Sequence, residues 1–351
     1  MTILTLQPGL GRLDYVLFSD GKEIHSGRLE ELRPKELMHD VSAGIELDAI
    51  ALRVVFGGSR FSAPAIASPG VVHELTSLVP AAPLHLPAVL DLLELFETVA
   101  PRTPVVLLFD TAFFARLPGR EAGYGIETET ASRLAVRRFG YHGIFHEAAI
   151  YEAQAWQGPI AGDQVKVLSI CLEPQPEAVG ALGGKPLYVT GGATPLEGLP
   201  GERTSGEIDP TILLDLVRER KWGPERIDQM LTHESGLFAL AERPATIEEV
   251  LLCSDPALEL ASAQLRYRIL QAAGSAAAVL GGLDVMVFSG RYARAGSRLG
   301  SWLGERLHLE GRGSAGGVPW LCFDGTLPRL MADRAAAVVR SAALPSSSPK
   351  W

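Results

Sequence analysis

Apolar and polar positions alternate with the period of β-strands in the first thirty residues. The alternation predicts three strands joined by short turns, over residues 2–6, 13–19 and 23–29. Because Asp20-Gly21 is a typical hairpin turn, we expect these strands to form an antiparallel meander. A further apolar run predicts a strand over 49–56, and apolar residues at helical spacing predict a helix over 86–100.

The same order of elements returns in the second half of the chain. After a helix over 143–156 we expect three more short strands, over residues 165–172, 178–182 and 186–190. Helical spacing then predicts three helices, over 209–220, 226–232 and 257–280. A buried strand over 285–289 follows the last of them. The repeated pattern predicts a duplicated α/β fold with a cleft between the two copies.

Asp110 ends an apolar run of residues that begins at Pro104. In open α/β sheets, chemistry gathers at the carboxyl ends of buried strands, where this carboxylate would lie. An equally simple interpretation is that Asp110 caps the next turn or helix. The pattern alone leaves both interpretations open.

Composition and charge narrow the class of protein. The chain has 351 residues, enough for two domains, and 32 basic against 41 acidic residues give a net charge of -9. That balance argues against a nucleic-acid or anionic-membrane surface, although one local arginine can still bind a small anion. Three widely spaced cysteines, Cys171, Cys253 and Cys322, predict buried, reduced thiols in a cytoplasmic protein. The first residues do not resemble a signal peptide, and no apolar run is long enough to span a membrane.

A motif scan excludes two common kinds of site. The chain has no G-x-x-x-x-G-K-[ST], and residues 311–316 fit a dinucleotide fingerprint in the wrong context, before a strand instead of a helix. No cluster of His, Cys and carboxylate residues has metal-ligand spacing. His142 and His146 lie four residues apart at a predicted helix start. They either cap and pack that helix or contact a phosphate or carboxylate.

Seven segments, in order and covering most of residues 45–290, resemble motifs of the acetate kinase (acetokinase) family. They are RVVFGG (53–58), APLHLP (82–87), VVLLFDTAF (105–113), RRFGYHGIFH (137–146), TPLEG (194–198), SGEIDP (205–210) and ESGL (234–237). APLHLP, FDTAF and TPLEG are the most specific of these. The chain is therefore identified as a divergent member of that family with an altered nucleotide site.

The resemblance implies an α/β fold of duplicated actin-like ATPase or sugar-kinase (ribonuclease-H-like) domains with an interdomain cleft. The first domain would comprise residues 1–112 and 327–345, the second residues 113–326, and a tail residues 346–351. The family also implies a homodimer that transfers a phosphoryl group between ATP and a short carboxylate such as acetate or propionate, with Mg²⁺. Neither nucleic acid nor membrane is an expected partner.

Several residues match the family's site by position. Arg53 would hold the substrate carboxylate, Asp110 would serve the metal or the attacking carboxylate, and His142 would contact the transferring phosphoryl group. Four further residues would line the acetate pocket with Arg53, namely Val55, Leu84, His85 and Pro195. A simpler interpretation is that Arg53, His85 and Asp110 persist as a buried polar network that holds the fold together.

The departures from the family fall on the phosphate and nucleotide side. In the first hairpin, hydroxyl donors are lost and Asp14 replaces a lysine of the family. In the second, the Gly-rich turn of the family becomes LEPQPE (172–177). A phosphate cradle presents backbone N–H groups, which Pro174 and Pro176 lack. A carboxylate about 4 Å from a like charge costs roughly 4 kcal/mol at an effective dielectric of about 20, so Glu173 and Glu177 would oppose a phosphate that they faced.

The remaining nucleotide motifs are also altered. The family's adenosine motif becomes GRYARA (290–295), and its catalytic arginine aligns with Thr204, one place after Arg203. A one-residue shift in that loop would let Arg203 serve in its place. The residues left to bind a nucleotide are Gly9, Gly11, Arg12, Gly290 and Arg291.

Two functions are compatible with this mixture. In the first, the protein is a divergent acetate kinase that phosphorylates a small carboxylate with ATP and Mg²⁺. In the second, it is a pseudokinase that binds a small carboxylate or acyl phosphate without ATP turnover or any cofactor, and acts as a sensor or partner protein. The altered turns favour the second function over ATP-dependent catalysis.

Overall fold

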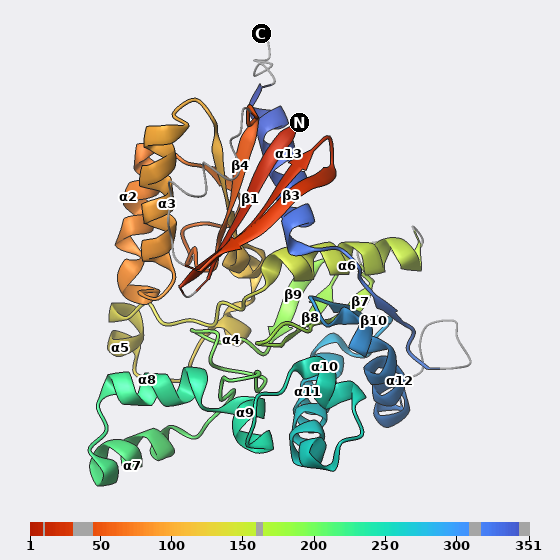
Figure 1. Ribbon diagram of the computed structural model, residues 1–351. Helices are drawn as coiled ribbons and strands as arrows, with labels where there is room; N and C mark the ends of the chain where they lie inside the picture. Colours follow the sequence, from red (N-terminus) through yellow and green to blue (C-terminus); the bar gives the residue numbers. More distant parts are fainter. Residues whose placement is uncertain (10, 31–44, 159–163, 309–316, 344–351) are drawn as a thin grey trace. The chain divides into compact units, whose positions relative to one another are not determined.

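The computed structural model describes residues 1–9, 11–30, 45–158, 164–308 and 317–343 (Figure 1). The chain divides into two compact units. Unit 1 comprises Met1–Ala115 and the C-terminal segment Thr326–Trp351, and unit 2 comprises Arg116–Gly325. Each unit has its own sheet and its own helices.

A six-stranded mixed sheet forms the centre of unit 1. Its strands are β1 (Thr2–Gly9), β2 (Arg12–Ser19), β3 (Lys22–Leu29), β4 (Ala49–Val54), β5 (Ala65–Ile66) and β6 (Val105–Phe109), in the spatial order β3-β2-β1-β4-β6-β5. The first three strands form the predicted antiparallel meander. β4 and β6 extend the sheet in parallel with β1, and all five residues of β6 are buried.

Helices cover both faces of this sheet (Figure 1). α2 (Pro69–Ser77) and α3 (Leu86–Val99) lie on one side, and α13 (Leu327–Ala343) contacts β1 and β4 from the other. Two 3₁₀ helices, η1 (Val79–Ala81) and η2 (Asp110–Arg116), follow α2 and β6. The stripe that α3 buries has the helical spacing predicted from its sequence, with Leu86, Val89, Leu92, Leu93 and Phe96.

Unit 2 is built around a five-stranded sheet. Its strands are β7 (Lys166–Cys171), β8 (Glu177–Leu182), β9 (Lys185–Val189), β10 (Val285–Ser289) and β11 (Trp320–Cys322), in the order β11-β10-β7-β8-β9. β7, β8 and β9 form an antiparallel meander, and β10 and β11 extend it in parallel. Every residue of β10 is buried, as its apolar run predicts.

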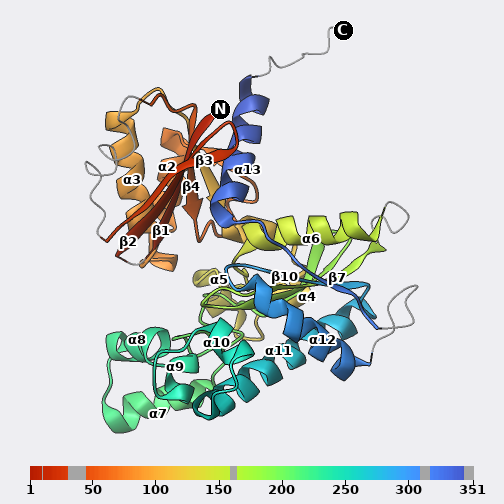
Figure 2. The same cartoon turned by 45° about the vertical axis from the view of Figure 1, so that its right-hand side comes forward.

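The helices of unit 2 lie on both faces of its sheet (Figure 2). α6 (Gly143–Gln157) contacts β7 and β10 on one face, and α11 (Glu259–Leu280) contacts β7, β8 and β9 on the other. The predicted core face of α11 is confirmed, because Leu265, Ile269, Ala273, Ala276 and Leu280 are all buried. The remaining helices are α4 (Gly119–Ala122), α5 (Thr128–Arg133), α7 (Pro210–Arg220), α8 (Pro224–His233), α9 (Gly236–Ala241), α10 (Ile247–Leu252), α12 (Gly296–Leu307), η4 (Pro256–Leu258) and η5 (Ala293–Ala295).

The two sheets have the same topology. In each, three consecutive strands form a meander, and the next two strands pair in parallel beyond the meander's first strand. The order β3-β2-β1-β4-β6 in unit 1 therefore corresponds to β9-β8-β7-β10-β11 in unit 2. This correspondence confirms the duplicated α/β fold that the repeated sequence pattern predicts.

Some expectations need correction. The strand expected over 49–56 ends at Val54, because the chain then turns and the N–H of Gly57 bonds to the Thr111 hydroxyl. The prediction of buried thiols is confirmed for Cys171 but is wrong for Cys253, which is exposed at the end of α10, and for Cys322 of β11, which is only partly buried. Residues 311–316 and 346–351 lie outside the described residues. In the described part of the chain, no helix is long and apolar enough to cross a membrane.

Candidate functional site

Asp110 lies where the buried strand β6 ends. β6 stops at Phe109, and Asp110 is the first residue of η2, with none of its side chain exposed. The next side chain anchors the segment, because the Thr111 hydroxyl accepts the backbone N–H of Gly57 at 2.9 Å. The sheet therefore fixes Asp110 at its carboxyl end, as the sequence pattern suggests for a functional carboxylate.

Arg53 on β4 forms a close ion pair with Asp110. Its Nε and Nη2 lie 2.8 and 2.7 Å from Oδ2 of the carboxylate, and the guanidinium side chain is only 18% exposed. Oδ1 of Asp110 is buried and has no hydrogen-bond partner within the described residues. Because an unsatisfied buried carboxylate oxygen is costly, this atom is a candidate acceptor for a further donor or cation, such as a water or a ligand.

His85 stands beside this pair at the start of α3. Burial lowers the pKa of its imidazole, and the positive charge of Arg53 lowers it further, against a smaller opposing effect of Asp110. His85 is therefore neutral at pH 7. Val55 is half-buried and Leu84 is 52% exposed. The structure thus gathers Arg53, His85 and Asp110 around one point of unit 1.

The surroundings of Asp110 bear on the metal that the family resemblance assigns to it. No group of three or more His, Cys, Asp or Glu side chains in the described ranges could hold a metal ion. Mg²⁺ nevertheless needs only one or two protein carboxylates when waters and phosphate oxygens complete its shell. The unpartnered Oδ1 of Asp110 fits such a single ligand, and no other part of a magnesium site is defined by the described side chains.

His142 and His146 of unit 2 have different environments. His142 has a left-handed backbone, with φ of 53°, just before α6, and its Nε2 donates to the carbonyl of Gln175 at 2.9 Å. His146 is fully buried, and its Nδ1 lies 2.9 Å from the Ser169 hydroxyl. Burial lowers the pKa of His146 well below its usual value, with a smaller contribution from His142. The packing interpretation therefore holds for His146.

Glu177, one of the two carboxylates predicted to oppose a phosphate, is buried. The backbone N–H of Tyr141 donates to both of its oxygens, at 2.8 and 2.9 Å. His146 Nε2 lies 3.3 Å from Oε2 of Glu177. A neutral His146 ring carries a proton on one nitrogen only, so the Ser169 hydroxyl donates to Nδ1 when that proton is on Nε2 and accepts from Nδ1 otherwise.

Glu173, the other such carboxylate, binds Arg291. Its two oxygens accept the backbone N–H of Arg291 at 2.7 Å and the Nε–H at 3.1 Å. Gly290, just before, has φ of 87°, and a Cβ there would lie 2.8 Å from the carbonyl oxygen of Leu172. The glycine is therefore required for the close packing of these two segments.

Arg203 does not stand alone in its loop. It donates to the carbonyl of His233 at 3.1 Å, and its guanidinium carbon lies 4.6 Å from the centre of the Phe238 ring. Thr204 beside it is buried, so its side chain is not offered to solvent. Pro195, assigned to the acetate pocket, accepts a hydrogen bond from the Gln175 amide through its carbonyl at 3.4 Å.

The first hairpin holds three residues assigned to nucleotide binding. Gly9 and Arg12 face each other across the turn between β1 and β2, and Gly11 has φ of 70°. Nε of Arg12 lies 3.4 Å from Oδ2 of Asp14, and Arg28 lies 2.5 Å from the other oxygen of Asp14. The side chain that replaces the family's lysine thus pairs with two arginines.

Glu197 of the TPLEG motif has a structural role. It pairs with Arg138 at 2.7 Å and accepts a hydrogen bond from the Tyr124 hydroxyl. Burial, with the hydrogen bond to Glu197, raises the pKa of Tyr124 to about 12. One of the most specific motifs is therefore explained by packing within unit 2.

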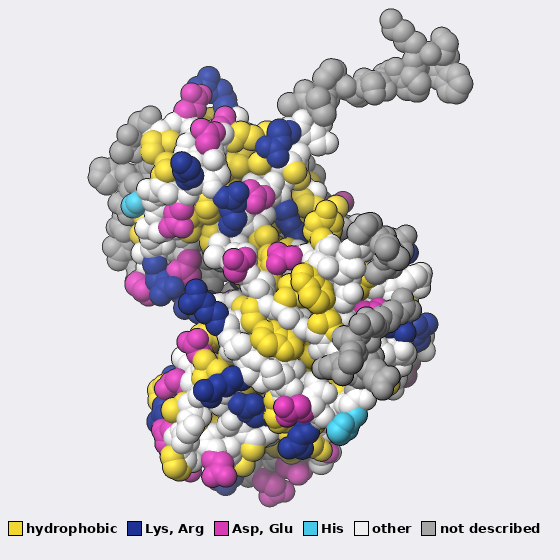
Figure 3. Space-filling model, turned by 90° about the vertical axis from the view of Figure 1, so that its right-hand side faces the viewer, with side chains coloured by type: hydrophobic (Ala, Val, Ile, Leu, Met, Phe, Trp, Pro, Cys, Tyr) yellow, Lys and Arg dark blue, Asp and Glu magenta, His cyan; other side chains and the backbone are white. Residues whose placement is uncertain are grey.

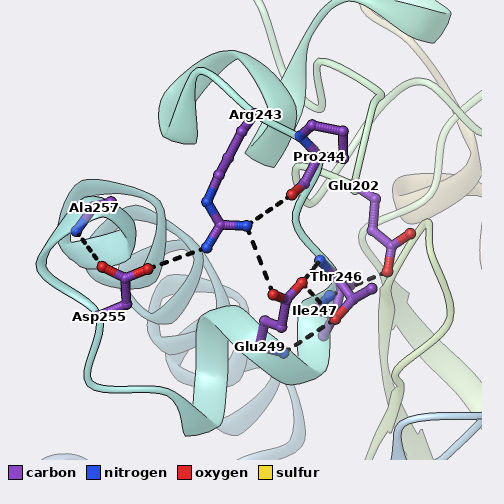
Figure 4. Close-up of polar contacts among 8 residues, drawn as sticks. All are labelled: Glu202, Arg243, Pro244, Thr246, Ile247, Glu249, Asp255 and Ala257. Carbon is purple, nitrogen blue, oxygen red and sulfur yellow. Dashed lines mark hydrogen bonds and ion pairs between the residues drawn. The ribbon is translucent and has the colours of Figure 1, made fainter.

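Sequence reasoning missed the role of Glu202 (Figure 4). Its carboxylate accepts the N–H of Ile247 at 3.1 Å, which caps the first turn of α10. Arg243 lies against the same helix start, between Glu249 and Asp255, at 3.6 and 3.2 Å. The T-x-x-E capping box at Thr246 was the available signal for this helix.

The fold and the site together define a class of protein. Two α/β units with one strand order are the actin-like ATPase fold, and solved acetate and propionate kinases share it. Acetate kinase from Porphyromonas gingivalis superposes with a TM-score of 0.84 at 22% identity, covering 96% of this chain and 99% of that one. A propionate kinase from Francisella tularensis gives 0.82 at 21% identity over the same shares. At these identities the likeness shows the fold alone.

Sequence comparison shows the family. A model of the acetokinase family matches residues 27–298. Acetate kinases of a Sulfurovum species and of Corynebacterium jeikeium are 35% and 34% identical over 74% and 70% of this chain. The chain belongs to the acetokinase family. It spans 65% and 61% of the length of those two relatives, less than two thirds of each.

Proposed function

We propose that the protein binds a short-chain carboxylate or its acyl phosphate beside Arg53, His85 and Asp110, and that it does not turn over ATP. The observation that supports the binding site most directly is the Arg53 guanidinium, a cation for an anionic ligand that the Asp110 carboxylate fixes in place. The buried Oδ1 of Asp110, which has no partner in the described part of the chain, can accept a hydrogen bond from a protonated ligand or coordinate a cation. The neutral imidazole of His85 adds a hydrogen-bonding group without a second charge.

The turn between β7 and β8 supports the proposal that the protein does not turn over ATP. Pro174 and Pro176 have no N–H to offer a phosphate, and Glu173 and Glu177 bind backbone N–H groups of unit 2. Mg²⁺, if it binds, would be held by Asp110. It would stabilise charge on a phosphoryl oxygen.

Calorimetry on the full chain tests the binding site. Acetate, propionate and acetyl phosphate should bind the wild type with micromolar to millimolar affinity, and Arg53→Gln should weaken binding at least tenfold. Arg329→Gln is the matched control, because Arg329 forms an exposed pair with Asp333 in the same unit. Absence of binding to the wild type, or equal binding to both variants, would contradict the proposal.

A second candidate function is ATP-dependent phosphorylation of the carboxylate, the activity that the relatives' name denotes. The observation in its favour is that Glu173 and Glu177 have partners of their own, so neither is an unpaired charge against a phosphate. Calorimetry with Mg·ATP and a coupled hydroxamate assay separate the two. Heat of binding, with hydroxamate formation that Asp110→Asn abolishes, would establish this second function.

We also propose a cytoplasmic homodimer that does not bind nucleic acid. α7 buries none of its 11 residues, and Ile212, Leu214 and Val217 are each about half exposed. On the face drawn in Figure 3, acidic and basic side chains are interspersed, which does not favour binding of a polyanion such as nucleic acid.

Light scattering tests the homodimer, and it should give a dimer for the wild type and a monomer for Leu214→Glu. An unchanged mass would exclude α7 as the interface.

A further inference from the structure

The turn between β7 and β8 supplies two carboxylates to backbone N–H and guanidinium groups, which are groups that ordinarily bind phosphates. We propose that Glu173 and Glu177 act as built-in anions that exclude polyphosphates from this part of unit 2, with Glu173 the specificity-determining residue. The inference rests on the proposed function in one respect, since it supposes that the wild type does not bind ATP.

Glu173 makes a bidentate contact with Arg291. One oxygen lies 2.7 Å from the backbone N–H of Arg291 and the other 3.1 Å from its guanidinium Nε. A backbone N–H beside an arginine is a typical donor set for a phosphate oxygen. The Glu173 side chain is only 14% exposed, so it fills this position and leaves little room for a second anion.

Glu177 provides an independent instance in the same turn. The backbone has positive φ on both sides of Tyr141, with 64° at Gly140 and 53° at His142. Backbone of this kind can turn N–H groups towards a common anion. Both oxygens of Glu177 take up the N–H of Tyr141, and the buried carboxylate also faces His146.

The backbone N–H groups next to Glu173 and Arg291 are also bonded within unit 2. The N–H of Tyr292 bonds to the carbonyl of Leu172 at 3.1 Å, and the N–H of Leu172 bonds to Ser289 at 2.7 Å. Burial, followed by a hydrogen bond to Glu202, raises the pKa of Tyr292 to about 12. This segment therefore binds its own neighbours, and removing the Glu173 carboxylate is the smallest change that would release a donor pair.

The test is calorimetry with Mg²⁺ and inorganic tripolyphosphate on the full chain. The wild type should show no binding at millimolar concentration, and Glu173→Ala should bind at least tenfold more tightly than the wild-type limit. Glu173→Gln keeps an acceptor for the Arg291 N–H but removes the charge, so it should fall between them. Thermal melting establishes that each variant is folded.

Glu234→Ala is the matched control. It removes one carboxylate of unit 2 that pairs with Arg226 at 2.8 Å, so it changes the net charge equally. Equal gains in Glu234→Ala and Glu173→Ala would overturn the inference, because net charge alone would explain them. The inference would also be overturned if the Glu173→Ala variant is folded but shows no tripolyphosphate binding.

The outcomes also separate this inference from the proposed function. Binding of Mg·ATP by the wild type would contradict both. Tripolyphosphate binding gained only in Glu173→Ala upholds the inference even where acetate fails to bind at Arg53. If the wild type binds acetate but Glu173→Ala gains no tripolyphosphate binding, only the proposed function is upheld.

Discussion

At the scale of single residues, the pair between Arg53 and Asp110 is the best-defined feature of unit 1. Asp110→Asn should lower the free energy of unfolding by about 2 to 4 kcal/mol, because it removes the negative charge that Asp110 holds against a largely buried guanidinium. Urea unfolding measures this loss. Asp333→Asn breaks an exposed pair and should cost less than about 1 kcal/mol. Equal losses would show that the buried pair is no more than a surface interaction.

His146 should make stability depend on pH. Its folded-state pKa lies below the unfolded value, so its contribution is complete above about pH 6.5 and is lost as pH falls, by up to about 1.4 kcal/mol per unit. Urea unfolding of the wild type between pH 7.5 and 5.5 should show this slope, and His146→Gln should flatten it. His73→Gln changes an exposed histidine and should leave the slope as in the wild type.

How far single residues could be predicted depended on where their partners lie in the chain. The position of Asp110 after a buried strand was readable, because a run of apolar residues sets it. Its pairing with Arg53, 57 positions away, was not readable from spacing, since only the parallel register of β4 and β6 creates it. Likewise, sequence showed the charge of Glu173 and Glu177 but not that both carboxylates would find partners.

At the scale of elements, two glycines should respond oppositely to alanine. Gly290 has φ of 87° and packs on the carbonyl of Leu172, so Gly290→Ala should destabilise the protein by at least about 2 kcal/mol. Gly274 lies within α11, where an added Cβ meets nothing within 4 Å. Gly274→Ala should therefore stabilise by up to about 1 kcal/mol. Thermal melts compare the two, and a shift of the same sign in both would contradict this reading of the turn.

Element prediction succeeded for the strands and for several helices with a regular apolar face. The strands of both meanders and the helices α3 and α11 were readable, because each buries one regular face. The short helices α4, α5, α9 and α10 were not predicted, and neither were α2, α12 and α13, although α13 has 17 residues. α10 has only six residues, and Glu202 and Arg243, which lie outside it in the chain, contact its residues Ile247 and Glu249.

At the scale of the whole molecule, the two units should differ in their ability to fold alone. Unit 2 is continuous in sequence, so residues 116–325 expressed by themselves should melt cooperatively. Residues 1–115 lack α13, which covers β1 and β4, so this segment alone should not melt cooperatively. Calorimetric melts of the two segments test this, and a cooperative transition in residues 1–115 would contradict it.

The place of α13 in the chain also has a consequence for biosynthesis. Its residues leave the ribosome after all of unit 2, yet they cover the sheet that was translated first. Throughout elongation, one apolar side of that nascent sheet therefore has no covering helix. Exposed apolar surface of this kind is what chaperones bind in incompletely folded proteins. Truncated messages and slow codons before residue 327 should therefore promote aggregation of the N-terminal strands.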